Sequence, residues 1–144
     1  MRISQILDSK GANVVTTGPA TTLAEAAKIL VQHNIGAIII LDDQDDPSGI
    51  FTERDLLRFV TTKDYDLETT PLSEVMTRKL VTISPTDGVA DALDLMKGHA
   101  IRHLPVMDGE EMVGIVSSRD VMNALHRSTA EENQHLKTYI FAVR

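Results

Sequence analysis

Two segments of the chain carry apolar residues at the 3.6-residue spacing that places them on one face of a helix. In order, these residues are Leu23, Ala26, Ala27, Leu30 and Val31, and then Val89, Ala92, Leu93 and Met96. The pattern predicts two amphipathic helices. Asn34 and Gly98 follow the apolar positions and indicate the helix ends, because both residue types accept the left-handed conformation that often ends a helix.

Shorter apolar runs surround each predicted helix, and their length indicates strands. A β segment precedes the helix, a buried strand follows it, and an acidic turn leads to a further strand and a second helix. These segments are residues 13–17, 37–41, 49–52 and 53–60 in the first copy, and residues 80–83, 103–107, 113–117 and 118–126 in the second. Each copy is therefore predicted to run β-α-β-β-α, which is an α/β (α+β) fold.

The two copies also match residue by residue. Val15-Thr16 aligns with Val81-Thr82, which lies 66 positions later. The first hairpin is one residue longer, so beyond it Arg54-Asp55 aligns with Arg119-Asp120 at an offset of 65. The period is too long for a solenoid and there are only two copies, so the repeat predicts a pseudo-twofold pair that closes one core.

The repeat sets the expected domain boundaries. Residues 1–70 form the first copy with its linker, and residues 71–127 form the second copy. The short segment Ser4 to Leu7 is predicted to begin the first copy, and Leu72 to Met76 plays the same part in the second.

A C-terminal tail, residues 128–144, belongs to neither copy. Glu131 to Ile140 is predicted to be helical. Tyr139 and Phe141 make the end of the tail apolar, so we expect it to pack against its own domain or a partner subunit.

Composition excludes several classes of function. The 144 residues, 42% of them hydrophobic, suit one domain or two very small ones with a packed core. A net charge of −7 without a basic run excludes a general attraction for DNA or RNA. The absence of cysteine excludes disulfides, thiolate nucleophiles and Cys-ligated metals. No apolar run resembles a signal peptide or a membrane span, so we expect a cytoplasmic protein without a membrane partner.

One five-residue pattern occurs twice, as FTERD at residues 51–55 and VSSRD at residues 116–120. A hydroxyl residue followed three positions later by an acid is the capping-box pattern of a helix start, which needs no ligand. The same strand-to-helix position suits an anion, and each copy adds an arginine, whose guanidinium matches phosphate. An aspartate there can accept hydrogen bonds from two vicinal hydroxyls. Ribose and phosphate together indicate a nucleotide.

These motifs resemble those of a known family, the CBS domains, and two tandem copies resemble a Bateman module. The resemblance covers residues 3 to 127 and rests on VTTGP and VTISP, on GIFTERDLL and GIVSSRDVM, and above all on RHLPVMD in the second copy. It implies two β-α-β-β-α units packed about a pseudo-twofold axis. It also implies that the clefts between the copies bind an adenine nucleotide such as AMP, ADP, ATP, NAD or S-adenosylmethionine.

The resemblance also implies a role for individual residues. The motif aspartates would hold the ribose hydroxyls, the motif hydroxyls would bond phosphate or ribose, and the β segments would flank the adenine. The residues implied to contact the nucleotide are Val15, Thr16, Thr17, Ala37, Thr52, Arg54 and Asp55 in the first copy and Val81, Thr82, Ile83, Arg102, His103, Pro105, Ser117, Arg119 and Asp120 in the second. Phosphate charge would fall mainly to Arg102 and His103. The first copy has Gly36-Ala37 at the corresponding place, so the two sites are not expected to be equivalent.

Other chemistry finds little support in the sequence. The histidines, among them His33 and His99, show no H-x-x-x-H or H-E-x-x-H spacing, and the acidic turn at residues 42–46 lacks the spacing of an EF-hand, so no metal site is predicted. There is no Walker A or G-x-G-x-x-G loop, and no catalytic residue is assigned.

The resulting hypothesis is a stand-alone, non-catalytic regulatory module. It would bind an adenine nucleotide, act as a homodimer and signal energy or redox state to a regulated protein whose identity the sequence does not give. The alternative is a structural dimerisation or protein-interaction module whose repeated motif only caps helices.

Overall fold

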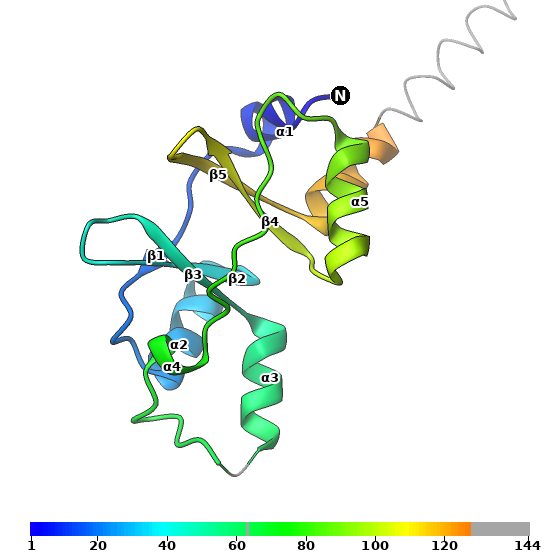
Figure 1. Cartoon of the computed structure of the whole chain (residues 1–144). Coiled ribbons are helices and arrows are strands. Elements are labelled where there is room, and N and C mark those ends of the chain that lie inside the picture. The colour runs from blue at the N-terminus through cyan, green and yellow to red at the C-terminus, as the bar shows by residue number, and fades with distance from the viewer. Residues whose placement is uncertain (63, 128–144) are drawn as a thin grey trace, which may run out of the picture. The chain divides into compact units, whose positions relative to one another are not determined.

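The computed structural model describes residues 1–62 and 64–127, which form two compact units (Figure 1). The first-repeat unit is Asn13–Leu80. The second-repeat unit combines Met1–Ala12 with residues 81–127. The second-repeat unit is thus built from two separate stretches of sequence.

The sheet of the first-repeat unit has the strand order β1-β2-β3. These strands are β1 (Thr16–Thr17), β2 (Ala37–Leu41) and β3 (Pro47–Thr52). β1 pairs in parallel with β2, and β3 pairs antiparallel to β2, as a hairpin partner should. Four consecutive residues of β2 are buried, because the strand is central and is covered on both faces.

Helices α2 (Leu23–His33), α3 (Glu53–Thr61) and α4 (Leu72–Val75) complete this unit. Thr22 caps α2 by accepting a hydrogen bond from the Glu25 N–H, and Asn34 ends the helix in the left-handed conformation, as predicted. The buried core consists of Leu23, Ala26, Leu30, Ile38, Ile40, Phe51, Leu72 and Met76.

The second-repeat unit has a two-stranded antiparallel sheet of β4 (His103–Asp108) and β5 (Glu111–Ser117). Helix α5 (Val89–His99) precedes β4, and a helix over residues 118–127 follows β5. The remaining helix is α1 (Ile3–Lys10). The core of this unit consists of Ile3, Ile6, Leu7, Ile83, Val89, Ala92, Met96, Leu104, Val106, Val116, Val121 and Ala124.

Helix α1 packs against the second repeat, and α4 packs against the first. A glycine makes each contact possible: a Cβ atom on Gly114 would lie 2.7 Å from Cδ2 of Leu7, and one on Gly49 would lie 2.5 Å from Sδ of Met76. The segment Ser4 to Leu7, predicted to begin the first sequence copy, packs in the core of the second-repeat unit. The boundaries at residues 70 and 127 remain a prediction about the sequence repeats. The compact units are divided differently, after Ala12 and after Leu80.

Most predicted elements are present, which confirms the α+β class, although the segment at 80–83 and the end of α5 differ from the prediction. The β segment at 80–83 forms only an isolated parallel bridge between Ile83 and Val106. Gly98 lies inside α5, and Ala100 takes the left-handed position with φ 54°. The predicted tail helix and its two aromatics lie outside the described residues.

Candidate functional site

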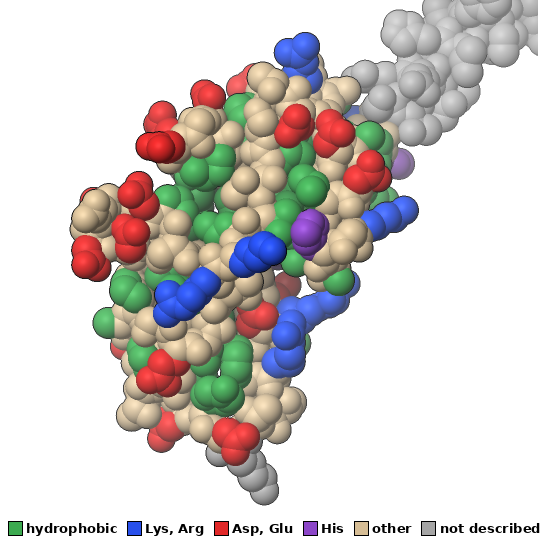
Figure 2. Space-filling model, viewed as in Figure 1, with side chains coloured by type: hydrophobic (Ala, Val, Ile, Leu, Met, Phe, Trp, Pro, Cys, Tyr) green, Lys and Arg blue, Asp and Glu red, His purple; other side chains and the backbone are tan. Residues whose placement is uncertain are grey.

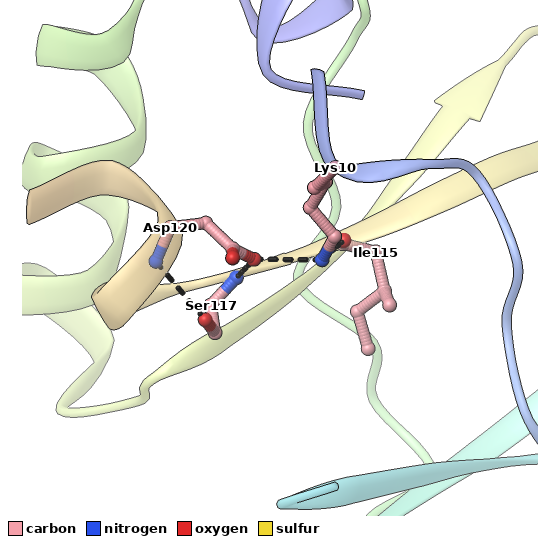
Figure 3. A network of polar contacts seen from close by, with 4 residues as sticks. All are labelled: Lys10, Ile115, Ser117 and Asp120. Atoms are coloured by element: carbon pink, nitrogen blue, oxygen red, sulfur yellow. Dashed lines mark hydrogen bonds and ion pairs between the residues drawn. The ribbon is translucent and has the colours of Figure 1, made fainter. Parts of the chain in front are cut away.

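The second motif forms a complete capping box where β5 meets the helix over residues 118–127 (Figure 3). Ser117 Oγ accepts a hydrogen bond from the Asp120 N–H at 3.2 Å. Asp120 Oδ2 accepts one from the Ser117 N–H at 2.8 Å. The chain folds this way because the box satisfies backbone donors that a helix start leaves without partners.

A third group joins this box from the N-terminal segment of the chain. Lys10, the last residue of α1, donates from Nζ to Asp120 Oδ2 at 2.7 Å and to the Ile115 carbonyl oxygen at 2.7 Å (Figure 3). The Asp120 side chain is 19% exposed, so most of it is buried while part remains accessible to solvent. The lysine therefore holds the carboxylate and the end of β5 together.

This environment controls the charge of the Asp120 carboxyl. Burial, the largest single influence, raises its pKa, because burial penalises the charged form. The hydrogen bond and charge of Lys10, together with the hydrogen bonds to Ser117, act in the opposite direction and hold the pKa below its usual value. Asp120 is therefore a carboxylate at neutral pH.

The first motif forms the same box with a different cation. Asp55 Oδ2 accepts from the Thr52 N–H at 3.0 Å, and Thr52 Oγ1 accepts from the Asp55 N–H at 3.2 Å. The other oxygen, Oδ1, lies 3.4 Å from a guanidinium nitrogen of Arg58 on the same helix. The Arg58 side chain is 72% exposed, so this is a surface ion pair of little strength.

The sheets bring several other predicted residues beside these boxes. Ala37 lies opposite Thr52 in the β2–β3 ladder, and His103 lies opposite Ser117 in the β4–β5 ladder. The Ser118 N–H donates to the Arg102 carbonyl oxygen at 2.8 Å. The backbone of Arg102 and His103 therefore lies beside Ser117 and Ser118, at the start of the helix that carries Asp120.

Other predicted residues present mainly backbone or an exposed side chain. Ile83 and Pro105 have buried side chains, and the Ile83 N–H donates to the Pro105 carbonyl oxygen at 3.1 Å. Arg54 and Arg119 occupy the first helical turn with exposed side chains. Val15, Thr16 and Thr17 lie at β1, and Val81 and Thr82 precede the bridge of Ile83.

Lys10 is the site residue that sequence reasoning missed. Its distance along the chain hid it, because Lys10 and Asp120 are separated by 110 positions. The sequence contains one weak signal. When Ile3-Ser4 is aligned with Leu72-Ser73, Lys10 aligns with Lys79. That match identifies the segments as equivalent, but it does not say which repeat each one joins.

Neither a cluster of metal-ligating side chains nor a membrane-spanning helix is present in the part of the chain that the structure describes. Within residues 1–62 and 64–127, no three histidine or acidic side chains come together as a metal site would require. None of the described helices has the length and apolar character needed to cross a bilayer. Figure 2 shows both acidic and basic side chains on the face that it presents.

Comparison with protein families and curated proteins places these features in context. The model of the CBS domain matches residues 3–62 and 72–127. The CBS domain-containing protein YhcV of Bacillus subtilis is 39% identical over 119 residues, which cover 83% of this chain and 84% of that protein. The mitochondrial CBS domain-containing protein CBSX3 of Arabidopsis thaliana is 36% identical, covering 96% of this chain and 71% of that protein.

Solved structures agree with the sequence matches. A CBS-domain protein from Agrobacterium tumefaciens has a TM-score of 0.82 and 35% identity, covering 85% of this chain and 92% of the other. A CBS domain protein from Pyrobaculum aerophilum in complex with AMP has a TM-score of 0.75 and 29% identity, covering 83% and 89%. The CBS domain pair of protein MJ0100, in complex with 5′-methylthioadenosine and S-adenosylmethionine, has a TM-score of 0.78 and 27% identity, covering 89% and 98%. Two matched repeats, relatives above 30% identity and a shared fold together show that this chain belongs to the CBS domain family.

Proposed function

We propose that this chain is a non-catalytic regulatory module that binds an adenine nucleotide and signals energy or redox state to a protein partner. The observation that carries the proposal is the Asp120 carboxylate, which is ionised, partly exposed and fixed at a helix start. A group in that state is a ready acceptor for ligand hydroxyls.

The hydrogen-bonding capacity of the carboxylate fits a ribose. An ionised carboxylate offers about four lone-pair sites, two on each oxygen. The Ser117 N–H and Lys10 both donate to Oδ2, so we assign the ligand hydroxyls to Oδ1. Two sites on Oδ1 match the two hydroxyls of a cis-diol.

The groups around Asp120 fit a nearby phosphate. The start of the helix over residues 118–127 favours an anion, because its first N–H groups and its dipole point toward that end. Arg102 and Arg119 have exposed side chains beside it, and His103 lies opposite Ser117. We therefore assign ribose recognition to Asp120 and Ser117, and phosphate recognition to Arg102, Arg119 and His103.

The liganded relatives support an adenosine ligand and do not choose among nucleotides. AMP, 5′-methylthioadenosine and S-adenosylmethionine share adenosine with its ribose, and they differ in the group attached at the 5′ position. The adenosine part is thus the common element. The matching family model is that of the CBS domain, whose description names no enzymatic activity, which supports a non-catalytic role.

We further propose that the module acts as a homodimer through the helices that follow each motif. Leu57 and Val60 on α3, and Met122 and Leu125 on the helix over residues 118–127, are between 37% and 66% exposed. In each helix the two residues are three positions apart and share a face. Exposed apolar faces of this kind favour subunit contact.

The exposed apolar faces of α3 and of the helix over residues 118–127 also favour a second function, that of a structural dimerisation module. Both capping boxes are complete without a ligand, so a purely structural dimerisation module would need nothing further from Asp55 or Asp120. Ligand binding separates the two functions. In the regulatory case, a nucleotide shifts the conformational balance only to the extent that it binds one state better than another.

Calorimetric titration of the full chain with AMP, ADP, ATP, NAD and S-adenosylmethionine tests the proposal. We expect at least one to bind, and we expect Asp120→Ala to lose most of that affinity. Asp91→Ala is the matched control, because Asp91 Oδ2 also accepts a backbone N–H at a helix start, from Gly88 at 2.8 Å. If none of the five binds at millimolar concentration, the structural alternative stands.

A further inference from the structure

We propose that Lys10 is a positioning residue that makes the second-repeat site selective for ligands with a vicinal diol. It does so by holding the carboxylate through Asp120 Oδ2, so that Oδ1 is the oxygen that meets the ligand. This inference rests on the proposed function and deepens it. It assigns a binding role to an N-terminal residue that lies outside both repeated motifs.

The geometry of the lysine carries the first step. Its ammonium group has two partners on β5 and the following helix, the Ile115 carbonyl and Asp120 Oδ2, each at 2.7 Å. A cation held by two acceptors at this length has little freedom to move. With Ser117 as the second donor to Oδ2, the plane of the carboxylate is fixed in the capping box.

The anchoring of α1 carries the second step. Ile3, Ile6 and Leu7 are buried in the core of the second-repeat unit, so the helix that ends at Lys10 is held by packing. Ser9 Oγ also accepts a hydrogen bond from Arg127 at 3.1 Å. Lys10 is therefore presented to Asp120 from a rigid support, which a positioning role requires.

The contrast with the first repeat carries the third step. There the aspartate is contacted by Arg58 at Oδ1, the oxygen that remains for a ligand in the second repeat. Lys79, which corresponds to Lys10 in sequence, is exposed, and no ion pair joins it to Asp55 within the described residues. The two repeats thus differ at the atom that would meet a ribose, and the second repeat is the one arranged for a diol.

If Lys10 positions Asp120, the site should distinguish a ligand with a vicinal diol from one without it. A lysine that only stabilised the fold would not produce this selectivity. A hydroxyl that hydrogen-bonds to a charged acceptor contributes a factor of roughly 10 to 100 in affinity. AMP should therefore bind about tenfold or more tightly than 2′-deoxy-AMP. If Lys10 positions Oδ1, its removal should weaken AMP more than 2′-deoxy-AMP and bring the ratio toward one.

The experiment measures the affinities of AMP and 2′-deoxy-AMP for wild type, Lys10→Met, Lys10→Arg and Lys79→Met by calorimetry on the full chain. We expect Lys10→Met to lower AMP affinity about tenfold and to collapse the ratio, Lys10→Arg to restore both, and Lys79→Met to match wild type. Lys10→Gln, which keeps a donor without the charge, serves if the methionine variant does not fold.

Two results would overturn the inference while leaving the proposed function intact. In the first, Lys10→Met keeps the wild-type ratio within about twofold. In the second, it binds AMP more tightly, which would make the lysine a competitor of the ligand. If wild type itself binds no adenine nucleotide, the proposed function and the inference fail together.

Discussion

Lys10 Nζ and Asp120 Oδ2 lie 2.7 Å apart although 110 positions separate the residues in the chain. The contact joins the N-terminal helix to the motif of the second repeat. Because α1 packs in the second-repeat unit, its last residue, Lys10, can hold the Asp120 carboxyl in the charged form.

The first prediction concerns pH. Because the folded-state pKa of Asp120 lies below its usual value, the stability that it contributes is present above about pH 3.9, the ordinary aspartate pKa, and is lost as pH falls through the folded value. Wild type should therefore melt above Lys10→Met at pH 7, and the gap should close on acidification. Thermal melts from pH 7 to pH 2 measure it. A gap that is unchanged at pH 2 would show that the lysine stabilises by packing alone.

The second prediction tests the packing of α1 on the second repeat and of α4 on the first. Ile3 and Leu72 are fully buried at equivalent places in α1 and α4, so replacement of either by alanine should cost about 2–5 kcal/mol. Ile3→Ala should reduce amide hydrogen-exchange protection in β4 and β5. Leu72→Ala should reduce it in β2 and β3. The opposite assignment of protection loss would contradict this packing.

The third prediction concerns the two close approaches at glycine. Gly114→Ala would push a Cβ into the two methyl groups of Leu7, and overpacking of this kind costs about 1–3 kcal/mol. Gly49→Ala meets the flexible side chain of Met76 and should cost less. Urea denaturation measures both, and Leu7→Ala should recover part of the Gly114→Ala loss. Equal costs without any recovery would argue against these contacts.

The fourth prediction addresses the proposed homodimer. A charge at Leu57 or Met122 would have to be buried without a partner in the dimer, so Leu57→Glu and Met122→Glu should shift the chain toward monomer. Val31→Glu is the control, because Val31 is 80% exposed and lies on α2. Sedimentation velocity reports the oligomeric state. A dimer that survives both substitutions would place the interface elsewhere.

Much of this fold follows from local pattern. The spacing of apolar residues predicted α2 and α5, and the strand predicted at 37–41 has the same bounds as β2. These predictions succeeded because the helix and strand periods are visible within each short segment of sequence. The capping boxes were equally readable, since Ser117 and Asp120 are three positions apart and satisfy each other.

The parts that sequence reasoning missed depend on long-range packing. Helix α5 continues past Gly98, and Ala100 takes the left-handed conformation although glycine adopts it more easily. The partner of α1 could not be predicted either, because α1 and α4 have similar apolar patterns and each could fill either core. Lys10 was missed for the same reason.

A crystal structure of the full chain with AMP tests the central claim most directly. The account predicts that the ribose hydroxyls lie within hydrogen-bonding distance of Asp120 Oδ1 while Lys10 stays on Oδ2. Ribose bound away from Asp120, or bound with Lys10 displaced from the carboxylate, would contradict it.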